Sequence, residues 1–221
     1  MTSSAAARHR VSAFRGEFPA EPLTARRLAG LLDVPGCVRR QVLDLIGVPL
    51  DPLAELVGCP PGGQSPFALA RARQFEQLVT TGDMGPLLVL LRDRLGAPVE
   101  AVREWDLSAE QVLTQYRRGG VEFRALLSEQ YLEQMLDGDE KAVNLLRHPV
   151  LTLTLGSELT YVEPDLVAYT TTDPLHPVEI RSYACVDGYV DPGQVSLTAR
   201  EIAVHVIAAR QVARRLGRPP G

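Results

Sequence analysis

The chain has 221 residues, of which 45% are hydrophobic and 23% charged, a composition typical of a soluble globular protein. No apolar run comes near the ~18 residues needed to span a bilayer, and the polar, basic N-terminus lacks the apolar segment of a secretory signal. We therefore expect a cytoplasmic protein without a membrane partner. The net charge of −4 excludes a globally basic nucleic-acid-binding surface and restricts any such surface to a local patch.

The first third of the chain is predicted to be helical after an irregular start. Residues 1–22 have no sustained hydrophobic period and are expected to form a flexible arm with some basic character. Leucines at helical spacing predict a helix over residues 23–33 and a second over 38–47 that ends at Gly47. A loop rich in proline and glycine follows, and the next helix is expected over 67–81.

The middle of the chain predicts further helices. The segment 84–96 is very apolar, and we expect it to form a buried helix. Ser108 is expected to be the N-cap of the next helix, which ends at Gly119. Two more helices are expected, one over 121–138 and a short one over 140–149.

Strand-like sequence follows. Residues 150–169 alternate and are rich in Thr, Val and Leu, with a turn expected at Gly156-Ser157. A second strand-like run covers 177–186, after a turn-rich segment. An amphipathic helix is expected over 197–216. A long helical half, two or three strands and a helix predict an α+β fold with a short mixed sheet flanked by helices.

Two carboxylates and a cation are predicted to meet on these two runs. Glu179 and Arg181 are two residues apart, so on a strand they project to the same face. If the two runs pair as a hairpin, Asp165 joins them. Carboxylates held so close repel each other unless a divalent cation neutralises them. The alternative for Glu179 and Arg181 is an ordinary solvated pair on an edge strand.

The order of these residues resembles the PD-(D/E)XK nuclease superfamily, and within it the RecB-like nucleases. Pro164-Asp165 stands in the place of PD, and Glu179-Ile180-Arg181 stands in the place of E-x-K. The resemblance implies a restriction-endonuclease-like core. It also implies that Asp165, Glu179 and the backbone carbonyl of Ile180 hold Mg²⁺ or Mn²⁺.

The helix after the second run adds to the resemblance. RecB-like nucleases carry QxxxY there, and this chain has Glu201 and His205 at those positions. In the family these residues contact DNA and steady the site, so Glu201 is a candidate catalytic residue and His205 a candidate DNA contact. His205 filling the core with one ring nitrogen bonded is the alternative. Three residues differ from the family pattern: Arg181 replaces Lys, Glu201 replaces Gln and His205 replaces Tyr.

Two further candidate sites lie outside the core motifs. Glu76, on the helix over 67–81, stands where RecB-like nucleases place an additional acidic metal ligand, and a solvated helix charge is its alternative. The basic end of the last helix contains Arg210, Arg214 and Arg215, which form a plausible phosphate-contacting face. A solvated helix end is the alternative for these arginines.

The resemblance implies a metal-dependent nuclease that cuts DNA, in a defence or repair setting, with Asp165, Glu179, Arg181 and Glu201 as its catalytic residues. Arg181 can supply charge and hydrogen bonds but cannot act as a base. A degenerate nuclease-fold subunit that binds DNA or a partner protein is the alternative. A helical interaction protein with an incidental motif is a third possibility.

The resemblance also divides the chain into the arm at 1–22, a helical region over 23–148 that includes the first core helix, and a catalytic core over 149–221. RecB-like domains usually continue with another strand after the QxxxY helix, which this chain lacks. We therefore expect that a protein partner or a missing C-terminal part could supply that strand.

Cysteine usage argues against a metal cluster. Cys37, Cys59 and Cys185 are odd in number and widely spaced, which favours reduced thiols. The sequence around Cys37 resembles the opening of iron–sulfur-bearing CRISPR-adaptation exonucleases, but the clustered C-terminal cysteines of those proteins are missing. Four thiolates are the usual requirement, so no iron–sulfur cluster is expected.

Overall fold

The structure is a computed structural model that describes residues 13, 15–17, 21–32, 35–49, 54–55, 58, 65–80, 85–95, 102–138, 143–156, 158–170 and 175–218. Its helices are α2 (Ala25–Gly30), α3 (Val38–Leu45), α5 (Pro66–Thr80), α6 (Gly85–Leu95), α7 (Ala109–Tyr116), α8 (Val121–Leu136) and α9 (Pro192–Arg215). Its strands are β1 (Glu104–Asp106), β2 (Leu145–Arg147), β3 (Leu151–Leu155), β4 (Glu158–Val162), β5 (Leu166–Ala168) and β6 (His176–Val178). The expected mixture of helices with a short sheet is confirmed. Most of the arm at 1–22, most of the loop before α5, and Cys59 lie outside the described residues.

Four strands form a mixed sheet in the order β1-β2-β5-β6. β1 and β2 are parallel, whereas β2–β5 and β5–β6 are antiparallel pairs. The β5–β6 pairing confirms that the two strand-like runs form a hairpin. β3 and β4 form a separate antiparallel hairpin that turns at Gly156, as expected. The φ of 62° at Gly156 is a left-handed conformation that glycine adopts without a Cβ clash.

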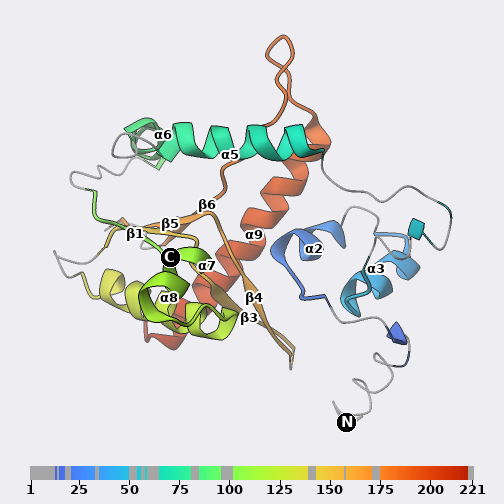
Figure 1. Cartoon of the computed structure of the whole chain (residues 1–221), viewed down its shortest axis with the longest axis horizontal. Helices are drawn as coiled ribbons and strands as arrows, with labels where there is room; N and C mark the ends of the chain where they lie inside the picture. The colour runs from blue at the N-terminus through green and yellow to red at the C-terminus, as the bar shows by residue number, and fades with distance from the viewer. Residues whose placement is uncertain are drawn as a thin grey trace.

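Different helices cover the two faces of the sheet. On one face Leu145 packs in a cluster with Leu87 of α6. On the other face Leu146 and Val167 belong to the larger core, which includes residues of α8 and α9. Figure 1 shows α5 and α6 along one end of the molecule, and α9 crossing its middle with α2 and α3 to one side and α7 and α8 to the other. α9 packs against α2, β3 and β6, so it links the N-terminal helices to the sheet.

The expectation of a helix over residues 140–149 is wrong, because the described part of this segment contains strand β2. Leu145 and Leu146 are both 0% exposed, and β2 lies between β1 and β5. Adjacent strand residues face opposite sides, so both leucines are buried in a sheet that helices cover on each face. A short apolar run of this kind does not distinguish a strand from a helix. Strand β1 is likewise missing from the sequence-based expectations.

Four helices depart from their expected form, the first being α2, which spans Ala25–Gly30 instead of residues 23–33. α6 is buried along one face only, since Leu87 and Leu91 are buried while Leu90 is 53% exposed, so the expectation of a buried helix holds for that face alone. α7 has the expected N-cap at Ser108 but ends at Arg117, which adopts φ 56°, instead of at Gly119. α9 begins at Pro192, ahead of the expected residue 197, where proline's missing N–H costs no helical hydrogen bond.

Among the described residues, none of the helices combines the length and apolarity needed to cross a membrane.

Candidate active site

The ends of β5 and β6 bring Asp165 and Glu179 together. β6 ends at Val178, earlier than the sequence predicted, so Glu179 and Arg181 follow the strand instead of lying within it. Val178 pairs with the first residue of β5, which places Asp165 and Glu179 opposite each other just beyond the ladder. The Ile180 N–H donates a 2.6 Å hydrogen bond to Asp165 Oδ2, which fixes that carboxylate. The predicted convergence therefore occurs, although outside the regular strand.

The helix α9 contributes two more side chains to the same place. Its N-cap is Asp191, whose carboxylate accepts a hydrogen bond from the Gly193 N–H at 2.9 Å. Glu201 and His205 are one turn apart, so they share a face, and each is only 2% exposed. His205 Nδ1 lies 2.8 Å from Glu179 Oε1. The His205 ring is buried against Glu179, as in the core-filling alternative, although neither ring nitrogen has a hydrogen bond of standard geometry among the described residues.

The Arg181 guanidinium lies at the centre of the three carboxylates. Its Nη1 is 2.9 Å from Asp165 Oδ2, and its Nη2 is 3.3 Å from Glu201 Oε2. Nη2 also contacts Glu179 Oε2. The Glu179 side chain is 1% exposed, whereas those of Arg181 and Asp165 are 31% and 23% exposed. The site therefore opens to solvent on the side of Asp165 and Arg181.

Burial sets the electrostatics of this cluster. Burial raises the pKa of Glu179, with a further upward contribution from Asp165, and these outweigh the lowering effects of His205 and Arg181. Neither Glu179 oxygen has a well-aligned hydrogen bond, so its close contacts with the His205 ring and the Arg181 guanidinium lack hydrogen-bond geometry. For Arg181, burial lowers the pKa, but the surrounding carboxylates outweigh it and raise the pKa overall. Arg181 is therefore a permanent cation beside a carboxylate that is costly to ionise.

A tyrosine that the sequence analysis did not single out ties this segment to α9. The Tyr183 hydroxyl donates a 3.1 Å hydrogen bond to the Gln194 carbonyl and also contacts the Thr198 hydroxyl. Tyr183 follows Glu179 and Arg181 at the same two-residue spacing, which is the signal that could have identified it. It positions the segment after β6 against the first turns of α9.

A buried arginine holds the chain just ahead of Asp165. Arg124, on α8, is 6% exposed and donates to the Leu107 and His148 carbonyls at 2.8 and 3.0 Å. It also donates to Glu163 Oε2 at 3.0 Å. The sequence signal was a charged residue on the helix face that also carries Leu127 and Leu132, both of which are buried. Arg124 thus positions the segment that carries Asp165 without touching the carboxylate cluster.

Glu76, on α5, lies beside the end of β2, the strand that neighbours β5, and outside the carboxylate cluster. Its carboxylate is 3.5 Å from His148 Nε2 and 3.7 Å from an Arg147 terminal nitrogen, at the end of β2. The His148 N–H donates a 2.9 Å hydrogen bond to the Asp165 carbonyl, so this corner adjoins the candidate site. The structure places Glu76 near the cluster, in contact with a histidine and an arginine.

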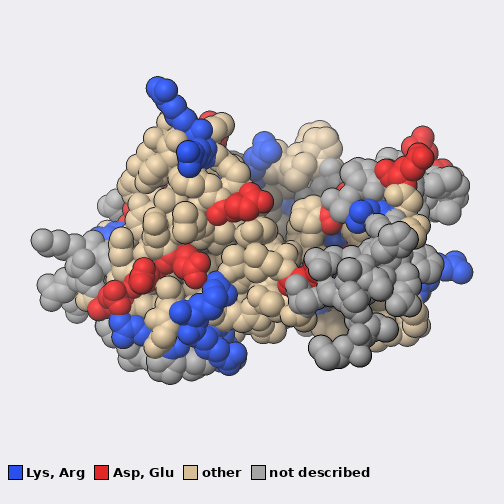
Figure 2. Space-filling view, turned by 90° about the horizontal axis from the view of Figure 1, so that it is seen from below, with Lys and Arg blue, Asp and Glu red and all other residues tan. Residues whose placement is uncertain are grey.

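The structure does not bring the basic end of α9 to the cluster. Arg215 is about 20 Å along the helix axis from Glu201, at 1.5 Å per residue. Its side chain pairs with Glu129 at 3.3 Å and contacts Thr152. Arg210 and Arg214 are exposed on the same helix. On the face shown in Figure 2, basic and acidic side chains are interspersed among uncharged residues.

The donor set suits a hard divalent cation, since carboxylate and carbonyl oxygens are the ligands that Mg²⁺ prefers. As they stand, no three His, Cys, Asp or Glu side chains among the described residues are arranged to hold a metal ion. The three carboxylates surround the Arg181 guanidinium, so this cation already occupies the place between them that a metal ion would take. Binding a metal at Asp165 and Glu179 therefore requires the guanidinium to move aside.

No protein-family model, curated protein or solved structure matches the chain. The functional interpretation therefore depends on the chemistry of the cluster.

Proposed function

We propose that the chain is a metal-dependent nuclease of the PD-(D/E)XK kind that hydrolyses DNA phosphodiester bonds. The observation that supports this most strongly is the convergence of Asp165, Glu179 and Glu201 on Arg181, at the solvent-facing end of β5 and β6. Two acidic groups at hairpin ends and a cation two residues on form the arrangement that the resemblance implies, and the next helix adds Glu201 where the family has Gln. A cytoplasmic location and a defence or repair setting belong to the same proposal.

Each residue has a chemical role in this proposal. Asp165, Glu179 and the Ile180 carbonyl would hold Mg²⁺ or Mn²⁺, which supplies an activated water and neutralises charge on the phosphate. Arg181 donates hydrogen bonds to a phosphate oxygen from its solvent-facing side and never gives up its proton. His205 orients the Glu179 carboxylate, because it contacts Oε1 while Oε2 faces Arg181.

The second candidate is a degenerate nuclease-fold subunit that binds DNA or a partner protein without cutting. It is favoured by the Arg181 contacts, because a guanidinium that already neutralises three carboxylates reduces their need for a metal ion. β6 lies at one edge of the sheet, where a partner strand could pair.

The test is cleavage of end-labelled single- and double-stranded DNA with Mg²⁺, with Mn²⁺ and with chelator. We expect metal-dependent cutting by the wild type and a loss of more than about a hundredfold in Asp165→Asn, because even the outer partners of metal ligands are typically worth 10–100-fold. Asp187→Asn is the matched control. It is exposed in the loop after Arg181, and asparagine tolerates its φ of 51°.

A wild type that binds DNA but does not cut it under any of these conditions contradicts the nuclease proposal and favours the degenerate subunit. Recovery of cutting by Arg181→Lys together with Glu201→Gln would identify the chain as a nuclease scaffold that has lost its chemistry.

A further inference from the structure

Helix α5 crosses the end of the sheet that carries the carboxylate cluster. Glu76 contacts Arg147 at the end of β2, and Arg71, five residues earlier, donates a 3.3 Å hydrogen bond to the Ser182 carbonyl after β6. Five helical residues span about 7.5 Å, close to the roughly 10 Å that two strand spacings cover from β2 across β5 to β6. α5 therefore passes the end of β5, where Asp165 lies, as Figure 1 shows.

One face of α5 carries large apolar side chains that the described residues leave exposed. Phe67, Phe75 and Leu78 are 85%, 39% and 64% exposed. Together with Arg71 they follow one another at intervals of three or four residues, so all four project within about 80° of arc around the helix. We call these four residues the α5 stripe. Contiguous exposed apolar surface of this kind marks a binding site.

A short hairpin rises from the chain directly after Ser182. In residues 183–190, which we call the pin, the backbone groups of Val186 and Tyr189 exchange hydrogen bonds of 3.0 and 2.9 Å. Asp187 and Gly188 between them have φ of 51° and 80°, as in the turns that close tight hairpins. Figure 1 shows the pin in orange, projecting past α5, and Tyr189 is 81% exposed. The hairpin therefore holds an aromatic side chain out toward solvent.

The α5 stripe places a cation between aromatic rings. Arg71 lies one helical turn from Phe67 on one side and from Phe75 on the other. Within the described part of the chain no carboxylate pairs with Arg71, so its charge is available to a phosphate. Aromatic rings that stack on successive bases, combined with cations that contact the backbone, are how proteins bind single-stranded nucleic acid.

The contact between Arg71 and Ser182 joins the stripe to the base of the pin, one residue from Arg181 of the cluster. We propose that the α5 stripe and the pin bind single-stranded DNA, with unpaired bases stacked on Phe67 and Tyr189 and a phosphate on Arg71. This inference rests on the proposed nuclease function and narrows its substrate, because the base faces of a duplex are stacked on each other and cannot reach these rings. The position beside the cluster favours DNA over a second protein as the occupant.

The experiment is fluorescence anisotropy in chelator, with a labelled single strand, the duplex of the same sequence and an abasic strand of the same length. We expect the single strand to bind at least about tenfold more tightly than the other two. Phe67→Ala and Tyr189→Ala should each weaken its binding at least about fivefold, since one stacked base is worth roughly 5–150-fold in affinity. Both side chains are more than 80% exposed, so the melting temperature should not change.

Two further variants separate stacking from other effects. Phe67→Leu should bind as weakly as Phe67→Ala, because leucine keeps the apolar surface but has no ring face for a base. Leu159→Ala is the matched control, because Leu159 is 56% exposed on β4, which Figure 1 shows away from α5.

Salt dependence tests the phosphate contact. Arg71→Gln should lower the slope of log affinity against log salt by about 0.7, the value for one phosphate of a single strand. Arg73→Gln should leave the slope unchanged, because Arg73 is exposed on α5 but projects about 160° away from Arg71. An unchanged slope in Arg71→Gln overturns the assignment of a phosphate to this residue.

Equal binding of the three oligonucleotides, or an absence of binding by all of them, overturns the proposal. So does a single-strand preference that survives both Phe67→Ala and Tyr189→Ala. Sedimentation of the protein alone gives a further outcome. A dimer that Phe67→Ala dissociates, and that Phe67→Leu preserves, would assign the stripe to a second copy of the chain and also overturn it.

Cleavage separates this inference from the proposed function. Cutting of duplex and single strand at equal rates, unchanged in Phe67→Ala and Tyr189→Ala, overturns the single-strand assignment and leaves the nuclease intact. A single-strand preference that these variants remove, in a protein that cuts nothing, supports the assignment and contradicts the nuclease.

Discussion

Replacing Arg181 with alanine is expected to destabilise the protein in chelator and to enlarge its stabilisation by Mn²⁺. Without the guanidinium, Asp165, Glu179 and Glu201 repel one another, and we expect a loss of roughly 2–3 kcal/mol. This is below the 3–5 kcal/mol typical of fully buried pairs, because 31% of the Arg181 side chain is exposed. Mn²⁺ should restore much of the loss, since a ligand that binds only the native state stabilises it by about 2.7 kcal/mol at one hundred times its Kd.

The measurement is thermal unfolding of wild type and Arg181→Ala with chelator and with saturating Mn²⁺. Arg214→Ala is the matched control, because Arg214 is an exposed arginine on α9 away from the cluster. If Arg181→Ala is as stable as wild type and its response to Mn²⁺ is unchanged, then Arg181 does not neutralise the carboxylates.

Replacing Glu179 with glutamine is expected to stabilise the metal-free protein increasingly as pH rises, while abolishing cleavage. Burial raises the pKa of Glu179 in the folded state above its ordinary value of about 4.3. Between the two values the unfolded state releases this proton first. The Glu179 contribution to the free energy of unfolding is therefore fully present below the ordinary pKa and is lost as pH rises through the folded pKa. Glutamine carries no titrating proton, so the variant avoids this loss.

Chemical denaturation of wild type and Glu179→Gln in chelator, from acidic to neutral pH, measures this difference. The stability of the variant relative to wild type should increase with pH across this window. Glu133→Gln, on an exposed part of α8, should show no comparable trend. A difference that decreases with pH would mean that Arg181 and His205 outweigh the burial of Glu179.

The sequence predicted the candidate site better than the fold around it. Two-residue spacing placed Glu179 and Arg181 on one side, hairpin pairing added Asp165, and four-residue spacing put Glu201 and His205 on one helix face. All of these are local relations, and the helix period fixes the direction of Glu201 and His205, whereas Glu179 and Arg181 follow the end of β6, where strand alternation no longer fixes direction. The segment from Asp165 to His205 therefore carried most of the information about the cluster.

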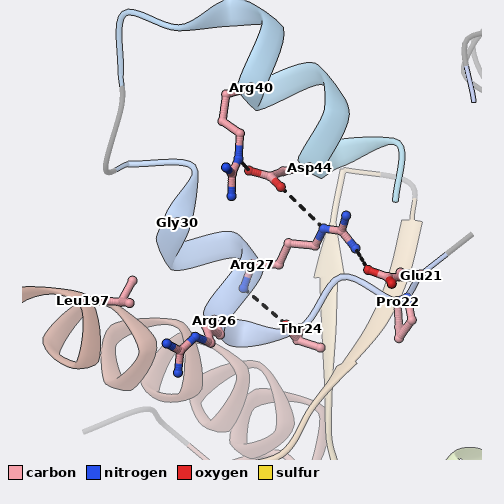
Figure 3. A pocket seen from close by; sticks show the side chains of 9 residues that line it. All are labelled: Glu21, Pro22, Thr24, Arg26, Arg27, Gly30, Arg40, Asp44 and Leu197. Carbon is pink, nitrogen blue, oxygen red and sulfur yellow. Dashed lines mark hydrogen bonds and ion pairs between the residues drawn. The ribbon is translucent and has the colours of Figure 1, made fainter. Parts of the chain in front are cut away.

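The features that the sequence did not predict depend on contacts between segments that are far apart in sequence. β2 was predicted as a helix because a short leucine-rich run is compatible with either structure, and its pairing with β1 and β5 decides the outcome. Arg124 donates a hydrogen bond to Glu163, 39 positions away, and hydrophobic periodicity does not predict contacts over that separation. A cavity between α2, α3 and α9, which Figure 3 shows, is lined by segments that are far apart in sequence. It arises from tertiary packing, so local sequence patterns could not predict it.

Calorimetric titration with Mn²⁺ of the wild type and of the Asp165→Asn, Glu179→Gln double variant tests the central claim, that these two carboxylates form a metal-dependent site. We expect saturable Mn²⁺ binding by the wild type and its loss in the double variant, because both hard-oxygen charges are removed while the shape of each side chain is kept. Equal binding by the two proteins would place the ion elsewhere and contradict the claim, as would an absence of binding in both.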